Sequence, residues 1–118
     1  MRMTTRPLMR RGDVVVIADR AAGDYGGKPR PAVVVQSELF DDTGSVVVCL
    51  LTTQPTGAPL LRIAVAPGPA SGLTNPSHIA VEKITAVRRE RVGQTLGRLS
   101  DEELVALNRS LAVFLGFG

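Results

Sequence analysis

The chain has 118 residues, of which 44% are hydrophobic and 21% charged, so it fits one compact domain with a real core and is not a disordered tail. Aromatic residues make up only 3%, which argues against an aromatic platform for stacking single-stranded nucleic acid. The formal net charge of +3 permits a polyanionic partner without requiring one. The single cysteine, Cys49, excludes an internal disulfide and is expected to be a small buried residue.

The ends of the sequence predict a cytoplasmic protein of one domain. No stretch approaches the roughly 18 apolar residues of a membrane span. The start, MRMTTRPLMRRGD, is basic but lacks the apolar run of a signal peptide. We expect residues 1–10 to be a basic extension and residues 11–118 to form the domain. Because Met9 opens the stretch MRRGD, whether residues 1–8 belong to the native chain stays open.

Short β-branched and apolar runs separated by Gly, Pro and Asp predict a mainly β fold. Residues 37–40 are expected to form one helical turn, and Arg62 is expected to face solvent. The predicted strands, of which the fifth could be one strand or two, cover residues 14–18, 32–36, 45–53, 60–65, 77–87 and 92–99.

The last part of the chain predicts a helix. Ser100 and Glu103 have the spacing of a capping box, and Gly116 is a natural stop. Apolar residues recur at helical spacing on one face: Leu104, Leu107, Leu111, Phe114 and Leu115. Many short antiparallel strands closed off by one C-terminal helix indicate a small SH3-like barrel.

The common catalytic constellations are absent from the sequence. There is no nucleophile elbow, no phosphate-binding P-loop and no metal-ligand spacing. The only histidine, His78, lies beside the apolar IAV and is interpreted as a half-buried structural residue rather than a general base.

Two segments could carry chemistry. The first, RAAGDYGGKPRP, holds Asp24, Tyr25, Lys28 and Arg30, and the prolines on both sides of the arginine restrict its backbone. A guanidinium held in this way suits a phosphate, which it can bind with two parallel hydrogen bonds.

The second segment is the strand end LLTTQ, which supplies Thr52, Thr53 and Gln54. Hydroxyls and amides at this point could contact a phosphate or a ribose 2′-hydroxyl. Plain β-propensity would also explain the threonines, so spacing alone leaves both interpretations open.

Five motifs follow one another from about Arg11 to the terminal helix: RGDV (11–14), GGKPRPAVVVQ (26–36), LLTTQ (50–54), GLTNPSHIAVEKITAV (72–87) and GRLS (97–100). Their order and spacing resemble those of the MazF/PemK family of bacterial toxins. The resemblance implies the toxin of a type II toxin–antitoxin pair, a homodimer of an SH3-like barrel. It implies a metal-independent, sequence-selective endoribonuclease that needs no cofactor. Such enzymes cut single-stranded RNA to 2′,3′-cyclic phosphate and 5′-hydroxyl ends, inhibit translation and growth, and are blocked by a cognate antitoxin.

The resemblance also implies site residues. Arg30, before a proline at the start of the second strand, matches the family's catalytic arginine, and Thr52 matches its catalytic threonine. Glu82 matches an acidic position that some members use near RNA, and Lys83 beside it is a further candidate for RNA contact. Many members carry Gly-Ser-Glu or Gly-His-Glu in the first loop, whereas this chain has Gly-Asp-Tyr at 23–25.

Because an arginine side chain stays protonated in proteins, we expect Arg30 to stabilise charge on the scissile phosphate. The proton acceptor stays open between Asp24 and Glu82.

Two alternatives remain. A non-enzymatic toxin of the same fold, similar to the gyrase-binding CcdB, would act through its terminal helix and a terminal Trp, but this chain ends FLGFG. A plain SH3-like module for proline-rich ligands needs an aromatic groove, which one Tyr and no Trp do not supply.

Overall fold

The computed structural model describes residues 8–18, 28–54 and 59–117. Within these described residues, six strands are followed by one α-helix, and three short 3-10 turns lie between them. The strands are β1 (Asp13–Ile17), β2 (Arg30–Val34), β3 (Ser45–Thr52), β4 (Arg62–Val65), β5 (Ser77–Arg88) and β6 (Val92–Arg98), and the helix is α1 (Asp101–Leu115). The 3-10 turns are η1 (Glu38–Phe40), η2 (Pro59–Leu61) and η3 (Arg89–Arg91).

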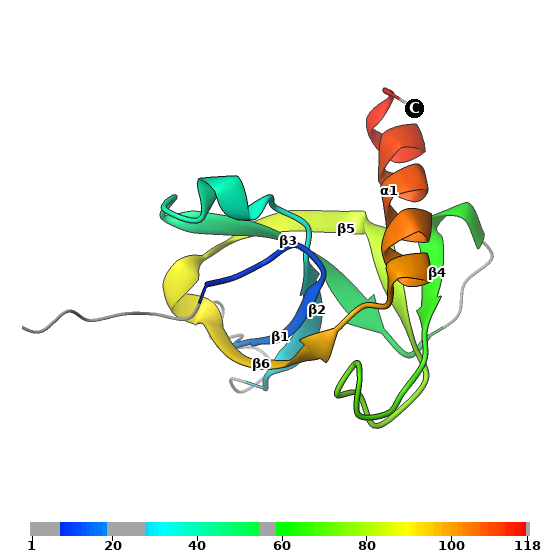
Figure 1. Cartoon of the computed structure of the whole chain (residues 1–118), viewed down its shortest axis with the longest axis horizontal. Coiled ribbons are helices and arrows are strands. Elements are labelled where there is room, and N and C mark those ends of the chain that lie inside the picture. Colours follow the sequence, from blue (N-terminus) through cyan, green and yellow to red (C-terminus); the bar gives the residue numbers. More distant parts are fainter. Residues whose placement is uncertain (1–7, 19–27, 55–58, 118) are drawn as a thin grey trace, which may run out of the picture.

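The six strands form one antiparallel sheet in the order β4-β5-β3-β2-β1-β6. The sheet curls strongly, and α1 stands at one end of it beside β4 and β5 (Figure 1). The predicted mainly β fold with a C-terminal helix is therefore confirmed. The description as a barrel fits roughly, because in the described part of the chain no ladder joins the edge strands β4 and β6.

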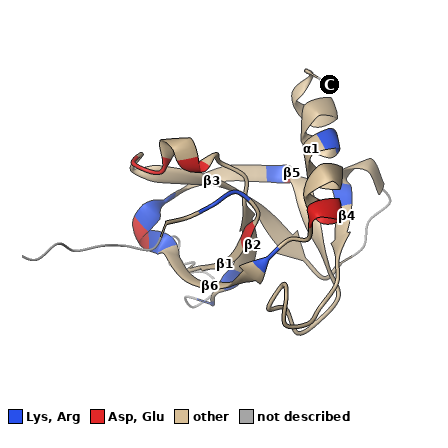
Figure 2. Ribbon diagram, in the orientation of Figure 1, with Lys and Arg blue, Asp and Glu red and all other residues tan. Residues whose placement is uncertain are grey.

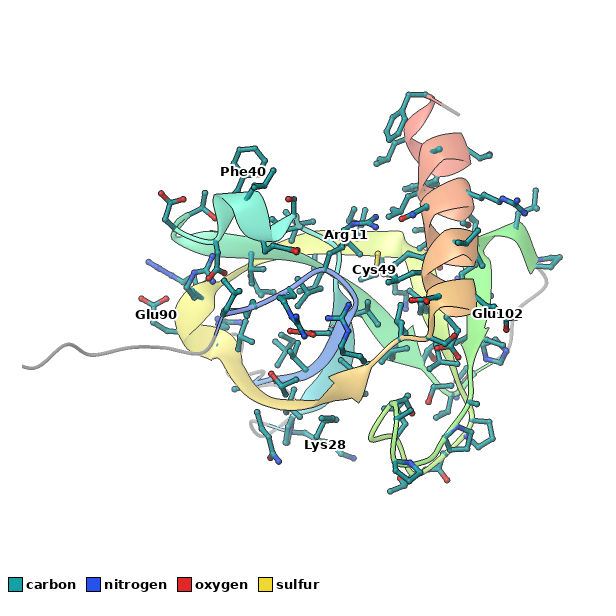
Figure 3. All side chains as sticks on the ribbon, in the orientation of Figure 1. Arg11, Lys28, Phe40, Cys49, Glu90 and Glu102 are labelled. Carbon is teal, nitrogen blue, oxygen red and sulfur yellow. The ribbon has the colours of Figure 1, made fainter. Side chains whose placement is uncertain are left out.

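Both faces of the central strands are buried, which explains their almost continuous Val, Ile and Leu. One cluster on the helix side includes Val33, Cys49 and Ile79 packed with Leu107 of α1. The other lies on the opposite face of the sheet and includes Val15 and Val48. Cys49 is fully buried, as expected (Figure 3).

Helix α1 begins and ends as the sequence predicts. Ser100 Oγ accepts the Glu103 N–H, and the Glu103 carboxylate accepts the Ser100 N–H. Gly116 closes the helix in the left-handed conformation, with φ 88°. The predicted apolar face is only partly buried. Leu107 and Leu111 lie in the core, whereas the last turn extends past the sheet and leaves Phe114 and Leu115 exposed. No helix in the described residues is long and apolar enough to cross a bilayer.

The expectation that Arg62 faces solvent is wrong. Its side chain is only 10% exposed and forms an ion pair with Glu82 of β5. The two residues share a face because Arg62 pairs with Ala80 in the ladder, and Glu82 lies two residues beyond Ala80. The pattern of residues 60–65 alone does not show that Glu82 of the neighbouring strand lies beside Arg62.

The segment 66–76 packs against the backbone of β6. The Arg98 N–H donates to the Ala70 carbonyl at 2.8 Å. A Cβ on Gly97 would lie 2.3 Å from that carbonyl oxygen, and one on Gly72 would lie 2.1 Å from the Leu96 oxygen. Glycine is required at both positions because two backbones approach too closely for a side chain.

Candidate active site

The ends of β2 and β3 bring Arg30 and Thr52 together. The ladder pairs Ala32 with Leu50 and Val34 with Val48. Continuing this register by two residues, to the first residue of β2 and the last of β3, places Arg30 opposite Thr52. Facing residues of an antiparallel pair have Cα atoms about 4.5–5.5 Å apart and side chains on the same face. The sequence motifs PRP and LLTTQ therefore meet at one point of the sheet.

An irregularity in β5 directs Lys83 to the same place. Between the pairs Cys49–Ile84 and Leu51–Ile79, β3 advances by two residues while β5 advances by five. The three extra residues form a bulge, which bends a strand and re-aims its side chains. Ile84 packs in the helix-side cluster, so Lys83, the residue before it, points to the opposite side, where Arg30 and Thr52 lie.

A pocket of about 370 Å³ opens between these strand ends. This volume lies in the range of small-molecule sites and admits a group of nucleotide size. Most of the predicted site residues line it, and Leu50, Leu51 and Ser77 complete its wall. The predicted residues that line it are Lys28, Arg30, Thr52, Thr53, Gln54 and Lys83, and Pro29 and Pro31 flank the arginine.

The pocket is cationic. Lys28, Arg30 and Lys83 line it, and no Asp or Glu of the described residues does so. All three cations are exposed, and Figure 3 shows Lys28 extending from the end of the molecule where β2 begins. Acidic residues gather elsewhere, at the first turn of α1 and around the turn after β2 (Figure 2). The arrangement suits an anionic ligand such as a phosphodiester.

Thr52 is held by its own chain. Its Oγ1 accepts the backbone N–H of Gln54 at 3.0 Å, which fixes the rotamer of Thr52 and turns the chain out of the strand. The hydroxyl proton remains available to donate to a ligand in the pocket. Thr52 is partly buried, whereas Thr53 and Gln54 are exposed at the rim.

Glu82 does not line the pocket with the other predicted residues. Its carboxylate pairs with Arg62. The hydrogen bond from Arg62 holds the pKa of the Glu82 carboxyl below its usual range, with smaller contributions from the Glu82 backbone and the charges of Arg62 and Lys83. A carboxylate held in this way is a poor proton acceptor, and its position indicates a structural role.

Asp24 and Tyr25, the other candidates from the first loop, lie outside the described residues. Nothing in the sequence marks Leu50, Leu51 or Ser77 as lining residues, although all three stand inside the five motifs, because apolar strand residues and a lone serine carry no chemical signal of their own. Among the described residues no group of three or more His, Cys, Asp or Glu could hold a metal ion.

Comparison with known proteins identifies the family. The sequence model described as "PemK-like, MazF-like toxin of type II toxin-antitoxin system" matches residues 10–115. The chain belongs to this family.

A similar protein in sequence is the "Probable endoribonuclease MazF" of Mycolicibacterium smegmatis, which is 46% identical over 108 residues, covering 92% of this chain and 97% of the relative. Solved structures agree on the fold. A mycobacterial endoribonuclease in complex with its cognate antitoxin superimposes with a TM-score of 0.74 at 24% identity, covering 96% of this chain and 98% of that one. A MazE–MazF complex from Deinococcus radiodurans gives 0.76 at 18% identity, covering 96% and 100%.

Proposed function

We propose that this MazF/PemK-family toxin is an endoribonuclease that cuts single-stranded RNA at the Arg30–Thr52 pocket. The observation that supports this most is the juxtaposition of an arginine framed by prolines with a threonine hydroxyl in a cationic pocket that no described carboxylate lines. The name of the M. smegmatis relative points to the same activity.

In the proposed reaction, the ribose 2′-oxygen attacks the adjacent phosphorus and the bond from phosphorus to the 5′-oxygen breaks. The departing 5′-oxygen takes up a proton from water. The products are a 2′,3′-cyclic phosphate and a 5′-hydroxyl. Charge builds up on the non-bridging phosphate oxygens in the transition state, and Arg30 stabilises it by two parallel hydrogen bonds. Thr52 donates its hydroxyl proton to one of the same oxygens. Lys28 and Lys83 bind the flanking phosphates, and Thr53 and Gln54 contact the RNA at the rim.

The 2′-hydroxyl must lose a proton during attack. Arginine does not serve as the acceptor, because a guanidinium stays protonated in proteins. Glu82 is committed to Arg62. Of the two acidic candidates we therefore favour Asp24 from the first loop. An Asp24→Asn variant is expected to bind RNA normally and to lose most of its cleavage rate.

Four variants test the site. Arg30→Ala and Arg30→Lys remove the guanidinium fork, and the second of these keeps the charge. Thr52→Val removes the hydroxyl at nearly constant volume. Arg109→Ala is the matched control, since Arg109 is an exposed arginine on α1 outside the pocket. We expect both Arg30 variants to lose about 10²–10³-fold in rate, as when one charge-stabilising donor is removed, and Arg109→Ala to cleave like the wild type. Normal cleavage by Arg30→Ala would refute the proposed site.

The proposed function also implies binding partners and a site of action in the cell. We propose a homodimer, a cognate antitoxin that blocks the pocket, and action in the cytoplasm, where the RNA substrate is found. The alternative, a CcdB-like toxin that binds gyrase, predicts gyrase-dependent DNA cleavage with Arg30→Ala as active as the wild type. The cationic pocket favours the nuclease.

A further inference from the structure

The only histidine of the chain stands beside the proposed catalytic threonine. His78 of β5 pairs directly with Thr52 of β3 in the antiparallel ladder, so the two side chains lie on the same face of the sheet. Because Arg30 faces Thr52 from the other side, the three residues form a row across β2, β3 and β5. His78 does not line the pocket itself, and Thr52 lies between it and Arg30 in this row.

The surroundings of the imidazole are unusual. Nδ1 is buried and has no hydrogen-bond partner among the described residues. Leaving a buried polar atom unpaired costs stability, and such atoms in native proteins call for an explanation. Because an unpaired N–H is harder to accommodate than an unpaired acceptor, the ring proton is favoured on Nε2. The residue is only partly buried and Nε2 is not among the buried unpaired atoms, so this edge of the ring is accessible.

Thr52 has room for such a donor. Its Oγ1 accepts one hydrogen bond, from the Gln54 N–H, and a hydroxyl oxygen can accept two. We propose that His78 is a positioning residue, whose Nε2–H donates to Thr52 Oγ1 when RNA occupies the pocket. With both acceptor positions filled, the threonine proton points away from Gln54 and His78, toward the phosphate beside Arg30. This role rests on the proposed function of the pocket.

Side-chain substitutions separate this role from a structural one. His78→Leu fills a similar volume without nitrogens, His78→Gln places an amide N–H near the position of Nε2, and His78→Asn places one near Nδ1. We expect His78→Leu and His78→Asn to lower kcat about tenfold, the effect of losing one orienting hydrogen bond, with KM unchanged within about twofold. His78→Gln keeps most of the activity. In thermal unfolding His78→Leu is at least as stable as the wild type, because the unpaired nitrogen is gone.

A double-mutant cycle tests the link to Thr52. The His78→Leu/Thr52→Val variant is expected to be no slower than Thr52→Val alone, since His78 acts only through the hydroxyl. Wild-type activity of His78→Leu would overturn the proposal. Equal losses of kcat in His78→Gln and His78→Leu would also overturn it. So would a double variant whose loss of kcat equals the product of the losses in His78→Leu and Thr52→Val.

A measurement without RNA keeps this proposal separate from the proposed function. Because the chain has one histidine, the imidazole nitrogen signals in an NMR spectrum of tag-free protein belong to His78. We expect the Nε2–H tautomer, and an Nδ1–H tautomer would overturn the proposal. If the wild type cleaves no RNA, the proposed function fails. The tautomer then still tests whether His78 Nε2 carries the proton that it would donate to Thr52.

Discussion

Substitution of Glu82 distinguishes a base from a structural anchor. Glu82→Ala leaves Arg62, whose side chain is 10% exposed, without its counter-ion. Breaking a fully buried pair costs about 3–5 kcal/mol. Because the Glu82 side chain is 29% exposed, we expect a smaller loss of unfolding free energy, about 2 kcal/mol. For a chain of 118 residues this lowers Tm by roughly 6–12 °C.

Glu82→Gln keeps an oxygen for the Arg62 hydrogen bond and should lose roughly half as much. The double variant Arg62→Met/Glu82→Leu should recover most of the stability, because an apolar pair of similar volume often replaces a buried ion pair without loss. Glu90→Gln, at an exposed acid of η3, is the matched control and should change nothing.

The assay has two parts, thermal unfolding at pH 7 and single-turnover RNA cleavage at a temperature where all variants are folded. All the Glu82 variants should cleave at near wild-type rate. A Glu82→Gln protein with normal Tm and a rate reduced a hundredfold or more would show that Glu82 is the base, and would refute the reasoning from its pairing with Arg62.

The Glu82 pair also sets a pH dependence. Its folded-state pKa is lowered from an ordinary value of 4.5. The pair therefore contributes its full stabilisation above that pH, and the contribution is lost as pH falls through the folded-state pKa. Between pH 7 and pH 3, Tm of the wild type should fall more than Tm of the double variant. Equal falls in Tm for the wild type and the double variant would contradict the assignment of this pH dependence to the Arg62–Glu82 pair.

Three other predictions follow from the packing and charge. Lys83→Ala should reduce the slope of log RNA affinity against log salt by about 0.7, the value for one phosphate contact on a single strand, and an unchanged slope would place Lys83 off the RNA. Gly97→Ala should lower the free energy of unfolding by about 1–3 kcal/mol through overpacking, since its Cβ would lie 2.3 Å from the Ala70 oxygen. Gly93→Ala is the control, because its Cβ would meet nothing closer than 3.5 Å. Equal Tm values for the two variants would contradict this contact. Burial raises the pKa of the Cys49 thiol to about 11, so a thiol reagent at pH 8 should modify it only after unfolding.

Local patterns were sufficient to predict much of the fold. The capping box at Ser100 and the glycine at 116 set the ends of α1, because helix ends depend on nearby residues. The β-branched runs predicted the strands within a few residues. The burial of the Arg62 side chain could not be predicted, because it depends on which strand lies beside β4.

Part of the candidate site could likewise be predicted from local motifs, and part could not. Short motifs predict Arg30 and Thr52 as site residues, and the register of β2 and β3 explains why the two lie together. The position of Lys83 depends on the bulge in β5, which no residue in VEKIT marks as a break. Glu82 and Lys83 are adjacent in sequence, yet one pairs with Arg62 and the other lines the pocket. The sequence pattern assigns no role to His78, because the role proposed for it depends on its partner across the ladder.

The most direct test of the central claim is the chemistry of the cut ends. The tag-free chain is incubated with a long RNA of mixed sequence in the presence of EDTA, and both ends at each cut are mapped. We predict cleavage with a 2′,3′-cyclic phosphate on one side and a 5′-hydroxyl on the other, and none with Arg30→Ala. Uncut RNA, or ends carrying a 3′-hydroxyl and a 5′-phosphate, would contradict cleavage by attack of the 2′-oxygen at the Arg30–Thr52 pocket.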